Sequence, residues 1–348
     1  MNQRRRTGTV TTALIAAAAL LATPFAGPLR DGVGRPAHCP TGHGTVDAAT
    51  LATDTPVAGC DLGGAVVSTG ALAVRVPDAD GSVTAAGMGR TGHPAVLTVT
   101  RSGGNVHATV GGNAGTEKEP PPEGIERFGR ADGSSTEPEP QALAAETAAI
   151  DARCADGAGS WLGMRWRSQY KWLLRTKYLP GYLGTADPVR DAIRAAGASV
   201  DDGHNDCGIG GGIALSQRYA GDTDRDANIR PDGTCGTRDE RNVVAFGELS
   251  GGLLALTCLW WSRGRTVEAD IRISDVDHLF ALQPTESCAD TWDLQGTLTH
   301  EFGHVFGLGH VTFAEHGELT MSDGLPACST RFRALGLGDY QTLKNQYG

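Results

Sequence analysis

The 348-residue sequence predicts an α+β protein in which a small all-β module precedes a mixed domain. The module is predicted from short β-prone runs that alternate with glycine-rich turns between residues 61 and 112. The mixed domain is predicted from a helix signal that is followed by a strand and by two paired apolar runs. A stretch rich in Pro, Glu, Gly and Ser separates the two regions and predicts a linker.

Residues 1–26 have the pattern of a secretory signal peptide. Three arginines precede an apolar run from Val10 to Ala22, and cleavage is expected after Ala26. The run is short and Ala-rich for a membrane span, although an uncleaved anchor is the alternative. The sequence therefore predicts a secreted, extracellular protein with no stable membrane insertion after signal cleavage.

Residues 27–112 are expected to form the small β-rich module, which is either a propeptide that is removed or a domain that is retained. Hairpin-type turns are expected at Asp80-Gly81 and at residues 102–105. The β-prone runs are residues 65–67, 71–76, 95–100 and 106–110. Residues 113–153 are expected to be an extended, protease-accessible linker.

Residues 154–348 are expected to form the mixed domain. Its first strand is predicted at Tyr170–Tyr178. A helix is predicted to begin at Asp187, with Pro188 at its first helical position, and to end at Gly197. Further elements are expected as strands at 243–249, 253–261 and 266–273, a helix capped by Asp290 or Thr291, and a last helix from Asp339.

The eight cysteines behind an export signal predict four disulfides in an oxidising compartment. Zinc–thiolate sites are the competing interpretation, but the sequence contains no C-x-x-C pair. We favour Cys39–Cys60, which are close in sequence, and Cys288–Cys328, which flank the helix expected to carry the metal ligands.

The net charge of −10 becomes −13 when the signal peptide with Arg4, Arg5 and Arg6 is removed, since that segment has no acidic residue. Nucleic acid is therefore not expected as a partner, because phosphate binding needs clustered Lys and Arg. The acidic balance leaves protein substrates open.

The stretch T-H-E-F-G-H-V-F-G-L-G-H, which begins at Thr299, carries the clearest chemistry. His300 and His304 are four residues apart, so on a helix both imidazoles leave the same face. Imidazole nitrogens at this spacing suit Zn²⁺. Glu301 follows the first histidine, where its carboxylate can act as the general base on a water at the metal.

Two further residues of the stretch complete a catalytic rather than a structural metal site. Gly307 can turn the chain out of the helix through a positive φ, which would bring His310 back as a third ligand. Three protein ligands leave the fourth position of zinc for water or substrate. The alternative, a helix with surface histidines and a glycine at its end, leaves Glu301 and His310 unexplained.

These residues resemble the extended zinc motif of the metzincin metallopeptidases. The methionine turn of that clan has its candidate in Met321, within E-L-T-M-S. Within the clan, E-F-G-H-V-F-G-L-G-H is most similar to the matrixins, as is the chain end from Leu335 to Gly348. One position departs from that pattern, because Val311 stands where matrixins usually have Ser.

The resemblance covers about residues 154–348 and implies a metzincin-like catalytic domain: a twisted, mixed five-stranded sheet with three helices. It implies a substrate cleft between the sheet and the zinc helix. The strand that contains Ala269, Asp270 and Ile271 would be the edge of the sheet and would pair with an extended peptide. An edge strand offers unpaired N–H and C=O groups for such pairing.

The expected function is that of a secreted, monomeric, zinc-dependent endopeptidase acting on a protein or peptide substrate. His300, His304 and His310 would hold zinc, which acidifies its bound water, and Glu301 would move the proton. Met321 would pack beneath the metal, since a thioether is a poor zinc ligand. The alternatives are a zinc hydrolase of non-peptide amides and a non-catalytic binding protein with the same fold.

Two weaker patterns have alternative interpretations. The loop D-x-D-x-D-x-N from Asp222 begins like a calcium loop but has Ala227 at the sixth position and Gly233 at the twelfth. It is either a structural Ca²⁺ site, which matrixins often have, or a solvated turn. Some matrixins are kept latent by a propeptide cysteine in P-R-C-G-x-P-D, which the surroundings of Cys39 and Cys154 resemble, although disulfides are favoured for both.

Overall fold

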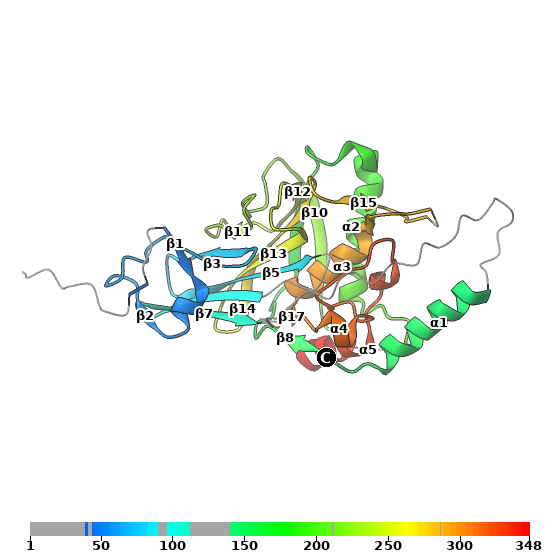
Figure 1. Cartoon of the computed structure of the whole chain (residues 1–348), viewed down its shortest axis with the longest axis horizontal. Coiled ribbons are helices and arrows are strands. Elements are labelled where there is room, and N and C mark those ends of the chain that lie inside the picture. Colours follow the sequence, from blue (N-terminus) through cyan, green and yellow to red (C-terminus); the bar gives the residue numbers. More distant parts are fainter. Residues whose placement is uncertain (1–38, 41–43, 90–95, 112–139, 211, 286) are drawn as a thin grey trace, which may run out of the picture. The chain divides into compact units, whose positions relative to one another are not determined.

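The computed structural model describes residues 39–40, 44–89, 96–111, 140–210, 212–285 and 287–348 (Figure 1). They belong to one compact unit, Pro36–Gly348. The α+β class is confirmed, because the described residues form mostly strands together with five α-helices. The expected signal peptide, residues 1–26, and residues 113–139 of the expected linker lie outside the described residues.

A mixed nine-stranded sheet organises the described chain. The adjacent strands β10, β9, β12 and β14 all run parallel. Strand β13 is antiparallel to both of its neighbours, β14 and β5. The order across the sheet is β10 (Gln217–Thr223), β9 (Tyr170–Arg175), β12 (Val243–Gly247), β14 (Arg265–Ser274), β13 (Leu253–Ser262), β5 (Gly81–Gly89), β6 (Val96–Ser102), β7 (Asn105–Gly111) and β2 (Thr55–Pro56).

The N-terminal region is β-rich as expected, but it does not form a module apart: β2, β5, β6 and β7 continue the sheet of the C-terminal region, and β1, β3 and β4 form a second sheet with β11. Figure 1 shows β5 alongside β13, and the register pairs Ala86 with Thr257. The reason lies in β13, which buries apolar side chains such as Leu254 and Leu256 on both faces and so resembles a central strand. The expected five-stranded sheet is therefore extended to nine strands.

Each face of the sheet is covered by a different layer. Helices α2 (Ala186–Asp201), α3 (Leu294–Val305) and α5 (Leu337–Tyr347) contribute to the core on one face, where Trp172, Ile193, Phe302 and Leu343 are buried. A four-stranded sheet packs on the other face, and the second core between the two sheets includes Val67, Val74, Leu97 and Leu256. Its strands are β1 (Thr45–Asp47), β3 (Val66–Thr69), β4 (Leu72–Arg75) and β11 (Thr234–Cys235).

Helix boundaries differ from the expected ones for local reasons. Helix α2 passes through Gly197 and ends at Asp201, because Val200 continues the buried face. Helix α3 is capped by Asp293, whose carboxylate accepts from Gly296 N at 2.7 Å, and not by Asp290 or Thr291. The remaining described elements are β8 (Ser160–Trp161), β15 (Leu279–Ala281), β16 (Thr291–Asp293), β17 (Leu308–Gly309), α4 (Phe313–His316) and the 3₁₀ turns Ala48–Leu51, Gly181–Leu183 and Arg331–Arg333.

Helix α1 (Pro140–Ala155) corrects the prediction that the linker extends to residue 153. The stretch from 142 to 149 is rich in Ala, which has the highest helix propensity. The end of the helix is anchored to the C-terminal part of the chain. Arg153 is only 3% exposed and pairs with Asp206 at 2.6 Å, and Cys154 forms a disulfide with Cys207.

All eight cysteines form disulfides, and both favoured pairs are confirmed. The bonds are Cys39–Cys60, Cys154–Cys207, Cys235–Cys258 and Cys288–Cys328, with no free cysteine. Neither Cys39 nor Cys154 is therefore a free thiol that could bind a metal. Four disulfides fit an oxidising compartment. No helix among the described residues is long and apolar enough to cross a membrane.

Candidate metal centre

Helix α3 places two of the three predicted histidine ligands. Its apolar face, with Leu298 and Phe302, packs into the main core, and the Asp293 cap fixes where the helix begins. His300 and His304 leave the helix one turn apart and are both fully buried. The core thus fixes the backbone from which both imidazoles project.

Gly307 provides the predicted turn that brings back the third histidine. Its φ is +94°, and its N–H donates to the carbonyl of His304 at 2.9 Å. A Cβ at this position would lie 2.3 Å from the carbonyl oxygen of Met164 and 2.5 Å from the ring of Trp161, so only glycine fits. Strand β17 then leads to His310, beside the other two rings.

The three imidazoles converge through their Nε2 atoms. Nε2 of His310 lies 3.0 Å from Nε2 of His300 and 2.9 Å from Nε2 of His304. The Nδ1 atoms of the two helix histidines face backbone carbonyls, of Thr320 at 2.7 Å and of Leu308 at 2.8 Å. In the neutral form each of these two Nδ1 atoms therefore carries the proton, and the Nε2 lone pairs of His300 and His304 face Nε2 of His310.

This donor set fits zinc. Ligands at 2.0–2.1 Å from a tetrahedral zinc ion lie roughly 3.3 Å from one another, close to the spacing of the three Nε2 atoms. A cation among these nitrogens would accept the lone pairs of all three imidazoles. The carbonyls of Thr320 and Leu308 supply the second set of contacts that holds metal-binding imidazoles in one tautomer.

The electrostatics of the site keep the helix histidines neutral. Burial lowers the pKa of His300 well below its ordinary value; His304 lowers it further, and the hydrogen bond to Thr320 opposes the shift. Burial lowers the pKa of His304 to about 4 against the opposing hydrogen bond to Leu308. Neutral imidazole is the form that binds metal.

Glu301 is fully buried next to the first histidine. Its Oε2 accepts a hydrogen bond from Thr257 Oγ1 on β13 at 2.5 Å, whereas Oε1 has no hydrogen-bond partner among the described residues. Burial raises the pKa of Glu301 to about 8, and the bond from Thr257 opposes the rise. A buried carboxylate oxygen without a partner fits a site that takes up a water or a substrate group.

Met321 packs against helix α3 at Gly303. It is 1% exposed, and a Cβ on Gly303 would lie 2.3 Å from its sulfur. Asp339 fixes the loop that carries it, accepting from Thr320 N at 2.8 Å, Gly336 N at 3.0 Å and Met321 N at 3.3 Å. The sequence identified Asp339 only as a helix start, and this second role depends on contacts distant in sequence.

The prediction that Ala269, Asp270 and Ile271 form an edge strand is wrong. They lie on β14, which pairs with β12 on one side and β13 on the other, and all three are buried. Tyr170 donates to the carbonyl of Ala269 at 3.1 Å. One face of β14 is apolar, with Ala269, Ile271 and Ile273, and the other carries the buried charged residues Glu268, Asp270 and Arg272. The strand that reaches Glu301 is instead β13, through Thr257.

A second group of side chains, missed in the sequence, consists of Asp239, Glu268 and Asp270, whose carboxylate oxygens converge. Glu268 and Asp270 are two residues apart on β14, and the loop before β12 brings Asp239 beside them, with Asp239 N donating to Glu268 Oε1 at 3.0 Å. Backbone N–H groups already occupy these oxygens: Asp270 accepts from Asn228 and Val243, each at 2.7 Å. Burial raises the pKa of Glu268 to about 7, against opposing backbone hydrogen bonds.

The loop considered as a calcium site has its carboxylates paired with arginines. Asp222 contacts Arg190 at 3.1 Å. Asp226 contacts Arg175 at 2.8 Å and Arg272 at 2.9 Å. These ion pairs engage the carboxylates of Asp222 and Asp226.

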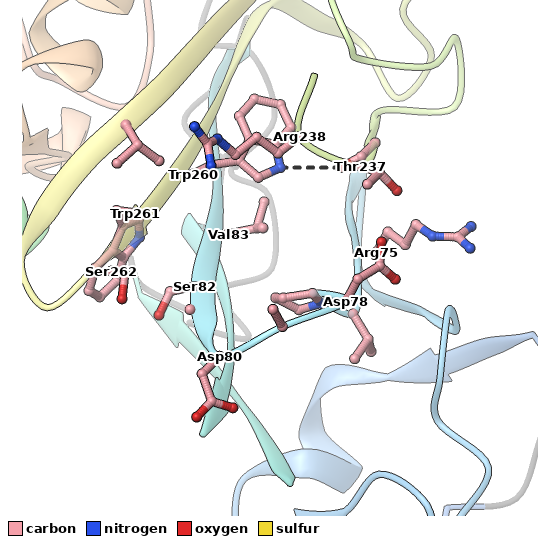
Figure 2. Close-up of a pocket in the computed structure, with 16 residues that line it drawn as sticks. Arg75, Asp78, Asp80, Ser82, Val83, Thr237, Arg238, Trp260, Trp261 and Ser262 are labelled. Carbon is pink, nitrogen blue, oxygen red and sulfur yellow. Dashed lines mark hydrogen bonds between the residues drawn. The ribbon is translucent and has the colours of Figure 1, made fainter. Parts of the chain in front are cut away.

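A pocket of about 290 Å³ opens beside the start of β5 and the end of β13 (Figure 2). Trp260 and Trp261 line it from β13, and Arg75, Asp78 and Asp80 line it from the N-terminal region. Trp260 donates from Nε1 to the carbonyl of Gly236 at 3.3 Å. None of the predicted site residues lines this pocket, so it is separate from the histidine cluster.

No protein-family model matches this chain, and no curated protein matches it either.

Proposed function

We propose that the chain is a secreted zinc-dependent endopeptidase. One observation supports this proposal most strongly: Nε2 of His310 lies within 3.0 Å of Nε2 of both His300 and His304, beside a buried carboxylate with one oxygen that has no partner among the described residues. A structural zinc site has no use for such a carboxylate. Secretion is supported by the signal-like pattern of residues 1–26 and by four disulfides.

His300, His304 and His310 would hold the metal. A zinc ion held by them supplies a Lewis acid that polarises the scissile carbonyl and lowers the pKa of water toward 7. Three histidines leave the remaining coordination position for the reaction, as in catalytic zinc sites.

Glu301 does the proton transfer. A cation on the three histidines would favour the ionised form of Glu301, which accepts a proton from the attacking water and then donates it to the nitrogen of the leaving amine. Thr257 holds Oε2 at 2.5 Å, so the other oxygen, Oε1, is the one that receives and delivers the proton. Fixing one oxygen restricts the rotation of the carboxylate and keeps Oε1 in place.

The test is zinc-dependent cleavage of a mixed peptide library, with the products identified by mass spectrometry. The zinc-loaded chain is assayed intact and after cleavage at a site-specific protease sequence inserted within residues 112–139. His304→Ala is expected to lose zinc and all cleavage. His316→Ala is the matched control, because His316 lies on α4 and contacts Asp156 at 2.9 Å outside the cluster. A zinc-loaded chain that cuts no peptide bond in either form would contradict the proposal.

A further inference from the structure

Strand β13 is the part of the sheet that lies against the candidate base. Thr257, in the middle of β13, reaches Glu301 from the sheet. An extended peptide that presents a backbone carbonyl at Glu301 therefore has to run beside β13. Such a peptide would pair through backbone groups, which makes the pairing largely independent of its sequence.

The place beside β13 is taken by the chain's own strand β5. Residues 82–89 pair antiparallel with residues 253–261, and Ala86 lies opposite Thr257. On its other side, the end of β5 forms a parallel bridge from Gly89 to Gly324, three residues after Met321. Strand β5 thus ends in a slot between β13 and the segment that supports the histidine cluster.

The side chains of β5 suit a close fit in this slot. A Cβ at Gly87 would lie 2.9 Å from the carbonyl oxygen of Ala255 and 3.0 Å from Cδ1 of Leu256. Ala85 and Ala86 are fully buried, and Met88 is buried in the same core as Met321. Small residues allow the backbone to approach β13 as closely as a bound peptide would.

No disulfide fixes β5 in this position. All eight cysteines are paired, and the Cys39–Cys60 bond lies within the N-terminal region, whereas the other three lie between Cys154 and Cys328. One break in residues 112–139 would leave β5 held by non-covalent contacts alone. After such a break, release of β5 from β13 would require no covalent bond to be broken, although β5 and its partner β6 would have to move together.

We propose that the edge of β13 is a docking surface for an extended antiparallel peptide, and that β5 fills it in the intact chain as a built-in competitor. This inference rests on the proposed function for its meaning, because it makes the intact chain a latent peptidase. Access to Glu301 then requires that β5 leave β13.

The test measures peptide binding in the Glu301→Gln chain, which does not depend on catalysis. The probe is a fluorescein-labelled peptide with the sequence of residues 81–89, and binding is followed by anisotropy. The chain carries the site-specific protease sequence within residues 112–139 and is compared intact and cut. We expect the cut chain to bind the probe at least tenfold more tightly than the intact chain.

Gly87→Val provides an independent perturbation, because its side chain would press on Ala255 and Leu256 and push β5 from β13. Gly63→Val is the matched control in the same region, since a Cβ at Gly63 meets nothing within 4 Å. We expect Gly87→Val to bind the probe at least tenfold more tightly than wild type, and Gly63→Val to bind as wild type does. If Gly87→Val does not fold, the comparison of cut and intact chains decides alone.

The outcomes separate this inference from the proposed function. Equal affinity in the intact and cut chains and in Gly87→Val, or binding in none of them, overturns the inference even if peptides are cleaved. Binding that appears only when β5 is released supports it, even if no peptide is hydrolysed, and in that case the proposed function alone fails.

Discussion

Replacing Gly303 by alanine tests the packing of Met321 under helix α3. The added Cβ would lie 2.3 Å from Sδ and 3.2 Å from Cε of Met321, and 3.4 Å from Cδ1 of Leu308. Met321 cannot simply swing away, because its backbone N–H and that of Thr320 are bound to Asp339. The substitution therefore forces a strained rotamer or a shift of the loop.

The expected loss of stability combines two opposing effects. Overpacking a well-packed core costs about 1–3 kcal/mol. Alanine in a helix interior is better than glycine by about 1 kcal/mol. We expect Gly303→Ala to lower the free energy of unfolding by a net of roughly 0–2 kcal/mol. Because the carbonyl of Thr320 orients His300, zinc affinity is expected to fall about tenfold.

The assay is urea unfolding of the metal-free protein in a double-mutant cycle with Met321→Ala, followed by zinc titration of each variant. Removal of the thioether eliminates the clash, so Gly303→Ala is expected to stabilise the Met321→Ala protein by up to about 1 kcal/mol. The two substitutions should then be coupled by more than about 1 kcal/mol. Additive effects within about 0.5 kcal/mol would refute the packing argument.

Three further changes follow from the same contacts. Thr257→Val leaves Oε2 of Glu301 buried without its donor. It is expected to lower the free energy of unfolding by about 1–3 kcal/mol and kcat/KM at least tenfold. Thr257→Ser should restore both, and its failure to do so would contradict the role of the hydroxyl. Asp339→Asn keeps only one acceptor oxygen for three backbone N–H groups, so the free energy of unfolding in urea should fall by about 2–3 kcal/mol. An unchanged unfolding midpoint would count against this role of Asp339. Burial raises the pKa of Glu268 from 4.5 to about 7, so the folded chain binds this proton more tightly than the unfolded chain. The stabilisation that comes from this bound proton is full below pH 4.5 and is lost as the pH rises through 7. The free energy of unfolding falls by at most roughly 3 kcal/mol over that range. Glu268→Gln should flatten the fall of stability between pH 5 and pH 7.5, and an equal slope in both proteins would show that another group causes it.

The sequence predicted the local parts of the site well. The spacing of His300 and His304, the glycine turn and the return of His310 depend on a dozen consecutive residues. The structure brings these three side chains together as that spacing implies. Two disulfides were predicted for the same reason, since their cysteines are near in sequence or flank one element.

The parts that the sequence did not predict depend on contacts between distant segments. Charged residues alternate with apolar ones along β14, a pattern typical of a half-exposed strand, so its buried position inside the sheet could not be deduced. The pairing of β5 with β13 joins segments about 170 residues apart, and hydrophobic patterns do not identify strand partners. The roles of Thr257 and Asp339 depend on the same kind of distant contact.

The most direct test of the central claim is the rate of peptide hydrolysis by the Glu301→Gln protein at a zinc content equal to that of wild type. Both proteins carry the inserted protease site and are assayed after it is cut, so that β5 does not restrict the access of peptides to Glu301 in either protein. Glu315→Gln is the matched control, because Glu315 is an exposed carboxylate on α4. We expect Glu301→Gln to bind zinc normally and to lose 10²–10⁴-fold in kcat, roughly the contribution of a general acid–base group, with the control unchanged. Hydrolysis by Glu301→Gln at the wild-type rate would contradict the account.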